Sequence, residues 1–229
     1  MYKRQAAEAL GTFVKTKNLK HCGSIGDVGC LSFNANKIIT TGSGGAIITN
    51  NKKIFDRAQY LSNQAKDDPF SYIHNDCGYN YKMNGICAAL GISQLRRLKS
   101  KIKLRKKIYE RYILNFKHVK DIKILRFEKN LTSNYCMNIV TFDKLNFKET
   151  NNISQKLSKK NIQTRRVWRP LHSQKYLTKF QKYKIDYANK IYSNSLCLPS
   201  DDIISDIQVD KISSLIKKYY KEIFNDINK

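Results

Sequence analysis

The chain has 229 residues, of which 41% are hydrophobic and 11% aromatic, so it can bury a core and is too apolar for a disordered protein. Its formal net charge of +25 at pH 7 leaves nucleic acid or an anionic membrane surface open as a partner. The excess is mostly lysine scattered along the whole chain, which favours a general composition bias over a selected basic patch.

Six cysteines lie far apart and form no C-x-x-C pair, which argues against a zinc ribbon or a redox dithiol. Two of them, Cys30 and Cys136, occur in apolar stretches, where a thiol usually packs as a small hydrophobic side chain. The first ten residues lack the apolar core of a signal peptide, and no run is long enough to span a membrane. We therefore expect a cytoplasmic protein with no membrane partner and no metal site.

The first half of the chain alternates strand-like and helix-like segments. Short apolar runs at 26–33 and 45–50 predict buried strands, with a turn-rich stretch between them. Residues 51–64 predict a surface helix. A long helix is expected from Asn84 to about Phe116, and its basic faces suit either a solvated helix that links two domains or a helix that binds nucleic acid.

The pattern changes after residue 118. The expected strands lie at 121–127, 135–142 and 162–168, and the expected helices at 147–160, 185–196 and 206–227. The last helix is amphipathic, because Ile212, Ile216, Tyr219 and Ile223 fall on one stripe. This order predicts a small α/β domain with helices on one face of a mainly antiparallel sheet, and a domain boundary between 1–118 and 119–229.

The segment SIGDVGCLSFNANKIITTGSGGAIITN carries the most chemistry. It places Lys37 in a turn between two apolar strands, after Ser32 and just before a glycine-rich stretch. An amine held in a partly dry pocket loses its proton more readily and can act as a nucleophile. A serine hydroxyl and glycine-rich backbone amides suit a phosphate. On these residues alone, an ordinary solvated loop lysine is the more common explanation for Lys37.

Several strings in the chain resemble one family in order and spacing. SFNANKIITTGSGG closely resembles the Schiff-base lysine segment of the DegT/DnrJ/EryC1/StrS family of sugar aminotransferases, and AAEALG at 6–11 resembles a second family landmark. YIHNDCGYNYKMNGICAALGISQL at 72–95, RRVWRPLHSQ at 165–174 and LCLPS at 196–200 also resemble the family. The resemblance implies an α/β fold of the aspartate-aminotransferase type. Residues 1–118 would be the carboxy-terminal part of the large domain that binds pyridoxal 5'-phosphate (PLP), and residues 119–229 the small α/β domain.

The resemblance also implies roles for individual residues. Lys37 would form the Schiff base with PLP and move the proton between cofactor and substrate carbons. Ser32 would donate to the cofactor phosphate, and Glu8 would contact the ring hydroxyl. Asn80, in the string GYNYK, would reach the phosphate of the neighbouring subunit's cofactor, which makes the active site a property of a dimer.

The implied reaction is an amino transfer from glutamate to a keto group of a nucleotide sugar. The stretch AKDDPFSYIHN is closest to the branch that aminates nucleotide-linked 4-keto-6-deoxy sugars for legionaminic acid-type or bacillosamine-type glycans. The implied partners are the nucleotide sugar, glutamate, and either a second copy of the chain or a full-length homologue. His74 and His172 are weaker candidates for contacts near the substrate, and structural or surface roles suit them better.

The chain departs from the family at two kinds of position. Family members carry an acidic pair where Arg4 and Gln5 stand here, and its aspartate pairs with the cofactor's ring nitrogen. Gln5 can hydrogen-bond that nitrogen but brings no negative charge, so if Gln5 occupies this site we expect a severe loss of turnover even with cofactor bound. Lys82 replaces a usual arginine, which keeps the charge but loses the planar fork.

A substantial amino-terminal segment of complete family members has no counterpart in this chain. We expect the large-domain part to expose sheet edge and apolar surface in consequence. A gene relic, one half of a split enzyme and a repurposed fragment all fit this observation. The alternatives to a working aminotransferase are an inactive fragment that acts as a basic binding protein and a partner subunit of an intact aminotransferase.

Overall fold

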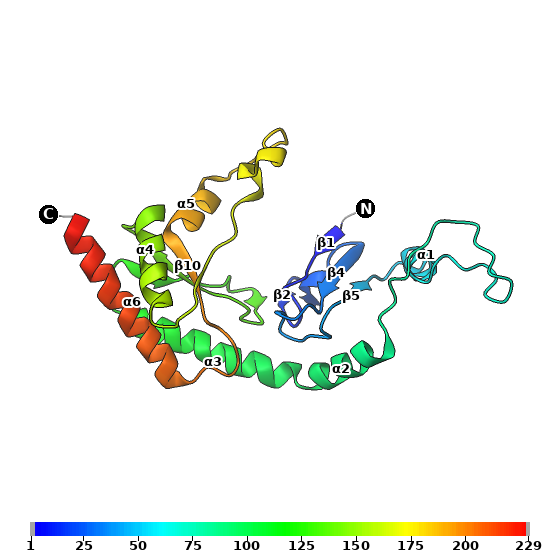
Figure 1. Cartoon of the computed structure of the whole chain (residues 1–229), viewed down its shortest axis with the longest axis horizontal. Coiled ribbons are helices and arrows are strands. Elements are labelled where there is room, and N and C mark those ends of the chain that lie inside the picture. The colour runs from blue at the N-terminus through cyan, green and yellow to red at the C-terminus, as the bar shows by residue number, and fades with distance from the viewer. Residues whose placement is uncertain (1–2, 228–229) are drawn as a thin grey trace. The chain divides into compact units, whose positions relative to one another are not determined.

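The computed structural model describes residues 3–227, which form two compact units (Figure 1). Unit 1 contains the residues up to Lys103 together with Phe127–Cys136, and unit 2 contains Leu104–Arg126 and the residues from Met137 onward. The helix α3 (Leu98–Phe116) therefore belongs to both units. These units are compact bodies defined by contacts, and the domain boundary between 1–118 and 119–229 stays a prediction.

The first sheet of unit 1 is mixed and carries the segments of greatest chemical interest. It contains β1 (Lys3–Gln5), β4 (Val28–Ser32) and β5 (Gly45–Ile48) in the order β1-β4-β5. The strand β1 runs parallel to β4, and β5 runs antiparallel to it. The strands expected at 26–33 and 45–50 are thus confirmed with shorter bounds. Strand β1 was not predicted, because three polar residues give no apolar alternation to detect.

A second sheet of unit 1 joins residues that lie far apart in the sequence. Strands β2 (Phe13–Lys15) and β3 (Leu19–His21) form a hairpin that is followed by a short 3₁₀ helix, η1 (Cys22–Ser24). Strand β7 (Leu131–Thr132) pairs antiparallel with β2. This pairing returns the later part of the chain to unit 1 and fixes the position of the residues that follow β7.

Two helices of unit 1 begin at asparagine caps. The Asn51 side chain accepts a hydrogen bond from the backbone of Lys53 (3.0 Å) at the start of α1 (Lys52–Ser62), and Asn84 caps α2 (Gly85–Arg96) in the same way. The helix at 51–64 is confirmed. The single long helix expected from 84 to 116 is wrong, because the chain leaves regular helical geometry at Arg97 (φ −93, ψ −3) and α3 then begins.

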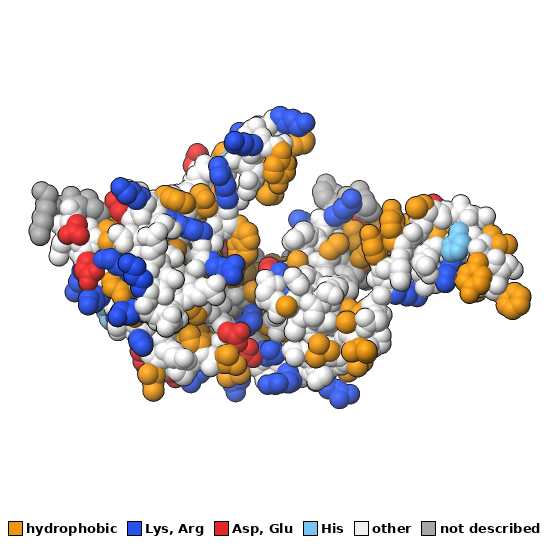
Figure 2. All heavy atoms as spheres, viewed as in Figure 1, with side chains coloured by type: hydrophobic (Ala, Val, Ile, Leu, Met, Phe, Trp, Pro, Cys, Tyr) orange, Lys and Arg blue, Asp and Glu red, His pale blue; other side chains and the backbone are white. Residues whose placement is uncertain are grey.

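The apolar face of unit 1 formed by β4, β5, α1 and two tyrosines is exposed. No residue of α1 is buried, and a groove of about 1030 Å³ lies along this face. Ile47 is 56% exposed, Phe55 49% and Tyr81 75%. Hydrophobic side chains accordingly gather around this part of the chain in Figure 2. The exposed apolar surface expected from the sequence is therefore present.

Unit 2 is built on a four-stranded sheet in which every pairing is antiparallel. Its order is β6-β8-β10-β9. The strands are β6 (Ile122–Ile124), β8 (Asn138–Phe142), β9 (Arg165–Arg166) and β10 (Ser195–Leu198). The antiparallel sheet is confirmed, but the helix expected at 185–196 is too long. Helix α5 (Asp186–Asn194) ends where the Asn194 side chain donates to the Phe142 carbonyl (3.1 Å), and β10 follows directly.

The helices α4 (Phe147–Ser158) and α6 (Asp206–Ile227) complete unit 2 as the sequence predicts. A capping box between Asn146 and Glu149 starts α4. The amphipathic stripe of α6 is buried, and the Tyr220 ring stacks on Phe142 of the sheet with ring centres 6.1 Å apart. The side chains of Phe142, Ile153, Leu157, Leu196 and Ile216 have no exposed surface and form the centre of this core.

Residues 3–227 contain neither of two features that would suggest other functions. None of their helices combines the length and apolar character that a bilayer crossing needs. Within the same range, no three or more His, Cys, Asp or Glu side chains gather where they could hold a metal ion.

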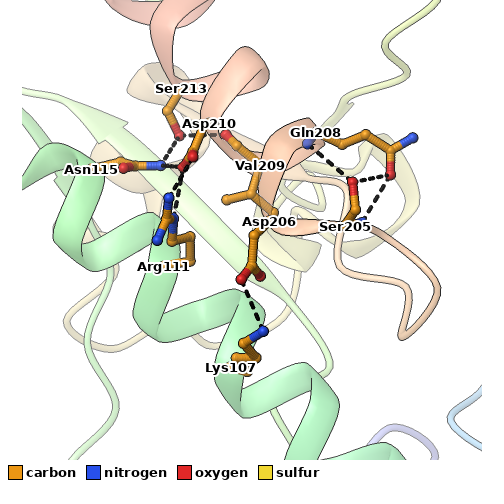
Figure 3. A network of polar contacts seen from close by, with 9 residues as sticks. All are labelled: Lys107, Arg111, Asn115, Ser205, Asp206, Gln208, Val209, Asp210 and Ser213. Atoms are coloured by element: carbon orange, nitrogen blue, oxygen red, sulfur yellow. Dashed lines mark hydrogen bonds and ion pairs between the residues drawn. The ribbon is translucent and has the colours of Figure 1, made fainter.

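A polar network ties α3 to α6 within unit 2 (Figure 3). Arg111 Nε donates to Asp210 Oδ1 (2.7 Å), and Asn115 Nδ2 donates to the same oxygen (2.9 Å) and to Ser213 Oγ (3.1 Å). Hydrogen bonds lower the pKa of Asp210 from 3.8 to about 2. The bond from Arg111 has the largest effect, and the bond from Asn115 the next largest. Lys107 and Asp206 form a second, simpler ion pair on the same helices (2.9 Å).

We expect Asp210→Asn to lower the Tm of the chain at pH 7 and to make the Tm fall less as the pH is lowered. Because folding depresses the pKa of Asp210, its contribution is complete above an unfolded value near 3.8 and is lost as pH falls toward about 2. Thermal melts followed by circular dichroism between pH 2 and 7 measure this. Asp206→Asn is the control and should cost less, since it removes one exposed ion pair. An unchanged acid slope for Asp210→Asn would contradict the assignment.

Candidate functional site

Lys37 lies in the loop between β4 and β5, and this loop is closed by its own hydrogen bonds. The backbone N–H of Lys37 donates to the Asn34 carbonyl (3.0 Å), and Phe33 N–H donates to the Gly44 carbonyl (2.9 Å). The next two residues, Ile38 and Ile39, are buried and anchor the loop against unit 1. The Lys37 side chain is consequently held inward and is only 14% exposed.

The Lys37 amine forms an ion pair with a Glu8 carboxylate oxygen, Oε1. Glu8 follows β1 in a tight turn, in which the Ala6 N–H donates to the Cys30 carbonyl (2.9 Å) and Ala9 N–H donates to the Ala6 carbonyl (2.9 Å). Since β1 and β4 are parallel, the segments that follow them leave the sheet at the same edge. The sheet therefore brings together two of the residues proposed from the sequence.

Two further candidates end the same pair of strands. Gln5 is the last residue of β1, is exposed and lies opposite Cys30. Ser32 is the last residue of β4, is half-buried, and its hydroxyl accepts from the Asn34 N–H (3.3 Å). The loop beyond Lys37 contains left-handed Gly42 (φ 82) and Gly44 (φ 97), a backbone conformation that glycine adopts at little cost. Hydroxyl groups and turn amides thus lie at the strand edge where the lysine loop begins.

The remaining candidates lie elsewhere. Asn80 is exposed and forms an isolated antiparallel bridge with Asn63, just beyond α1. The His74 ring lies 2.8 Å from the Gln64 carbonyl oxygen in the same exposed loop. His172 belongs to unit 2, where its ring nitrogen Nε2 lies 2.8 Å from the Asn189 side-chain oxygen. These contacts tie each histidine to its own segment.

The structure adds two residues that sequence reasoning missed. Cys136 Sγ donates to the second oxygen of Glu8, Oε2 (3.2 Å), and Asn134 Nδ2 donates to the Glu8 carbonyl (2.7 Å). The strand expected from residue 135 begins only at Asn138, because Tyr135 adopts a left-handed conformation (φ 55) that interrupts an extended chain. The prediction that Cys136 lies in a strand is therefore wrong. No sequence signal connects it to Glu8, which lies 128 residues away.

Comparison with known proteins identifies the family of this chain. The model of the DegT/DnrJ/EryC1/StrS aminotransferase family matches residues 4–217. The chain belongs to this family. GDP-perosamine synthase of Escherichia coli O157:H7 is 33% identical over 217 residues, which cover 94% of this chain and 57% of that protein. UDP-4-amino-4,6-dideoxy-N-acetyl-beta-L-altrosamine transaminase of Campylobacter jejuni serotype O:23/36 is 32% identical over 130 residues, 55% of this chain and 34% of that protein.

A solved structure extends the likeness to three dimensions. The PMP form of Spr1654 from Streptococcus pneumoniae superposes with a TM-score of 0.87 at 26% identity. The superposition covers 99% of this chain and 59% of the Spr1654 chain. The PLP form of the same protein gives a TM-score of 0.85. The expected α/β fold is confirmed. The chain spans little more than half the length of the relatives whose match covers nearly all of it.

Gly45 offers a test of the strand pairing behind this site. A Cβ at Gly45 would lie 2.3 Å from the Leu31 carbonyl oxygen, so Gly45→Ala must separate β5 from β4 beside Ser32. We expect a loss of about 2 kcal/mol or more in the free energy of unfolding, measured by urea denaturation. Gly85→Ala is the matched control, because a Cβ there meets no atom within 4 Å and lies at the start of a helix. Equal stability of the two variants would refute the clash.

Proposed function

We propose that this chain takes part in a PLP-dependent transfer of an amino group from glutamate to a nucleotide-linked 4-keto-6-deoxy sugar, for the synthesis of a surface polysaccharide. The observation that carries the proposal is the Lys37–Glu8 pair at the strand edge of unit 1, inside the segment that matches the family. A lysine amine of low exposure, beside a carboxylate that can accept or return a proton, is suited to proton transfer.

The residues at this edge fit PLP in part. Lys37 provides the amine that would hold the cofactor, Ser32 a hydroxyl for its phosphate, and Glu8 an acceptor for its ring hydroxyl. PLP, when bound, supplies the electron sink for the chemistry. Gln5 departs from the fit, because an amide cannot balance a positive charge on the cofactor's ring nitrogen.

The Lys37 amine must leave Glu8 before it can act as a nucleophile. Its amine is held by Glu8, and an ammonium group is not a nucleophile until it gives up its proton. Glu8 is the carboxylate that contacts this amine in the structure. The low exposure of Lys37 keeps competing water away from the amine, which strengthens every electrostatic contact made there.

The kind of sugar is proposed from two sources. The stretch AKDDPFSYIHN resembles the branch for legionaminic acid-type or bacillosamine-type sugars. The name of the C. jejuni relative describes a nucleotide sugar with an amino group at carbon 4 and deoxygenated carbon 6. Both are consistent with a keto group at carbon 4 as the acceptor.

The assembly is proposed to be a homodimer or a pair with a full-length homologue, joined through the surface that carries Asn80. Its exposed side chain is available to a neighbouring subunit. No specific observation favours nucleic acid binding, since the Lys and Arg side chains on the face shown in Figure 2 are spread over both units.

Incubation of the purified chain with PLP tests the proposal directly. We expect a visible absorbance band of bound cofactor that survives desalting, is absent from Lys37→Ala, and is bleached by glutamate. Lys53→Ala is the matched control, because Lys53 is an exposed lysine of the same unit. A folded, soluble chain that retains no band would overturn the proposal for this chain alone. Repeating the incubation after mixing with a full-length homologue would then test the partner-subunit alternative.

Gln5→Asp tests the proposed position of the ring nitrogen. A carboxylate at residue 5 would favour the positively charged ring, so we expect on the order of tenfold faster bleaching by glutamate. The dependence of the absorbance maximum on pH gives a second measurement. Arg4→Asp is the control, since neighbouring strand residues point to opposite faces, and it should bring no gain. Equal rates for Gln5→Asp and the unchanged chain would remove Gln5 from the site.

A further inference from the structure

A buried asparagine joins the Glu8 turn to the return segment that follows β7. Asn134 is only 3% exposed. Its Nδ2 donates to the carbonyl oxygens of Glu8 (2.7 Å) and Leu10 (2.9 Å), and its backbone N–H donates to Thr12 Oγ1 (3.1 Å). Three hydrogen bonds from one residue thus hold the turn that carries Glu8, across more than 120 residues of sequence.

The same asparagine sets the direction of Cys136. Asn134 Oδ1 accepts from the Cys136 N–H (3.0 Å), and the Tyr135 N–H donates to Ser133 Oγ (2.9 Å) while Tyr135 is left-handed. A left-handed non-glycine residue persists only where its surroundings hold it. The turn at 133–136 therefore points the Cys136 thiol toward Glu8 in a defined way.

Both oxygens of the Glu8 carboxylate consequently have a partner. Oε1 takes the Lys37 amine, and Oε2 takes the Cys136 thiol at 3.2 Å. A thiol is a weak donor, but its acceptor here is a charged carboxylate, whose side chain is 38% exposed. Without the thiol, the carboxylate could rotate about its last bond and would hold the amine less often.

We propose that Cys136 and Asn134 are positioning residues that keep the Glu8 carboxylate on the Lys37 amine and so control how readily that amine reacts. Asn134 anchors the turn, and Cys136 orients the carboxylate. The meaning of this control for catalysis rests on the proposed function. The contacts themselves need no cofactor.

Reductive methylation of lysines with formaldehyde and cyanoborohydride, followed residue by residue by peptide mass spectrometry, tests the inference without PLP. In the unchanged chain, Lys37 should react more slowly than exposed Lys53. Cys136→Ala should speed methylation of Lys37 about three- to tenfold, the effect expected for losing one ordinary hydrogen bond, since a thiol is a weak donor. Cys136→Ser keeps a donor in a side chain of similar size and should stay within about twofold of the unchanged chain.

The controls separate positioning from general loosening. Lys156, which pairs with Glu222 in unit 2 (2.7 Å), should keep its methylation rate in every variant. In a Glu8→Gln background, Cys136→Ala should not speed methylation of Lys37 further, since the carboxylate that Cys136 orients is gone. Asn134→Asp, which removes the two side-chain hydrogen bonds to the turn and keeps the backbone one, should also speed methylation of Lys37.

Equal rates for the alanine and serine variants would overturn the role of Cys136, and an unchanged rate for Asn134→Asp would overturn the role of Asn134. Absence of a PLP band together with the expected methylation pattern would instead refute the proposed function and leave this inference standing.

Discussion

The ion pair between Lys37 and Glu8 is the contact on which the candidate site depends. It joins the loop that links β4 to β5 with the turn that follows β1. A lysine of such low exposure requires a partner, because an unpaired ammonium group is costly to remove from water. The parallel pairing of β1 with β4 supplies that partner from a turn 29 residues earlier in the chain.

Asn134 and Cys136, which donate hydrogen bonds to Glu8, belong to the same compact unit as the ion pair, although they lie more than 120 residues away in the sequence. Residues 127–136 belong to unit 1 although the residues on both sides of them belong to unit 2, and their strand β7 pairs with β2. Unit 2 has a core of its own, centred on Phe142, Ile153 and Ile216, and its own polar link between α3 and α6. The candidate site therefore lies in unit 1, and the core around Phe142 lies in unit 2. A substitution in the core of unit 2 need not alter the Lys37 contacts.

Sequence reasoning was most accurate where a single periodic pattern determines the structure. The apolar stripe of α6 gave its bounds directly, and the runs around Ser32 and Ile47 gave β4 and β5. It failed where the signal is short or non-local. Strand β1 has three polar residues, β10 is continuous with α5, and the interruption at Arg97 leaves no mark in the apolar spacing. For the site, a family motif proposed Lys37 and Glu8, which the fold brings into contact. The contact of Cys136 with Glu8 follows a left-handed residue, Tyr135, and could not be inferred from residue type.

The exposed groove along α1 has a practical consequence for any solution study of this chain. Dyes that fluoresce in apolar surroundings bind to open hydrophobic surface, and Ile47, Phe55 and Tyr81 provide such surface while the chain is still folded. A dye-based melting curve would therefore start from a high baseline and could be mistaken for a molten state. Loss of near-ultraviolet circular dichroism is the better criterion, because it follows the packing of the aromatic rings in unit 2 and does not depend on how much apolar surface unit 1 leaves open.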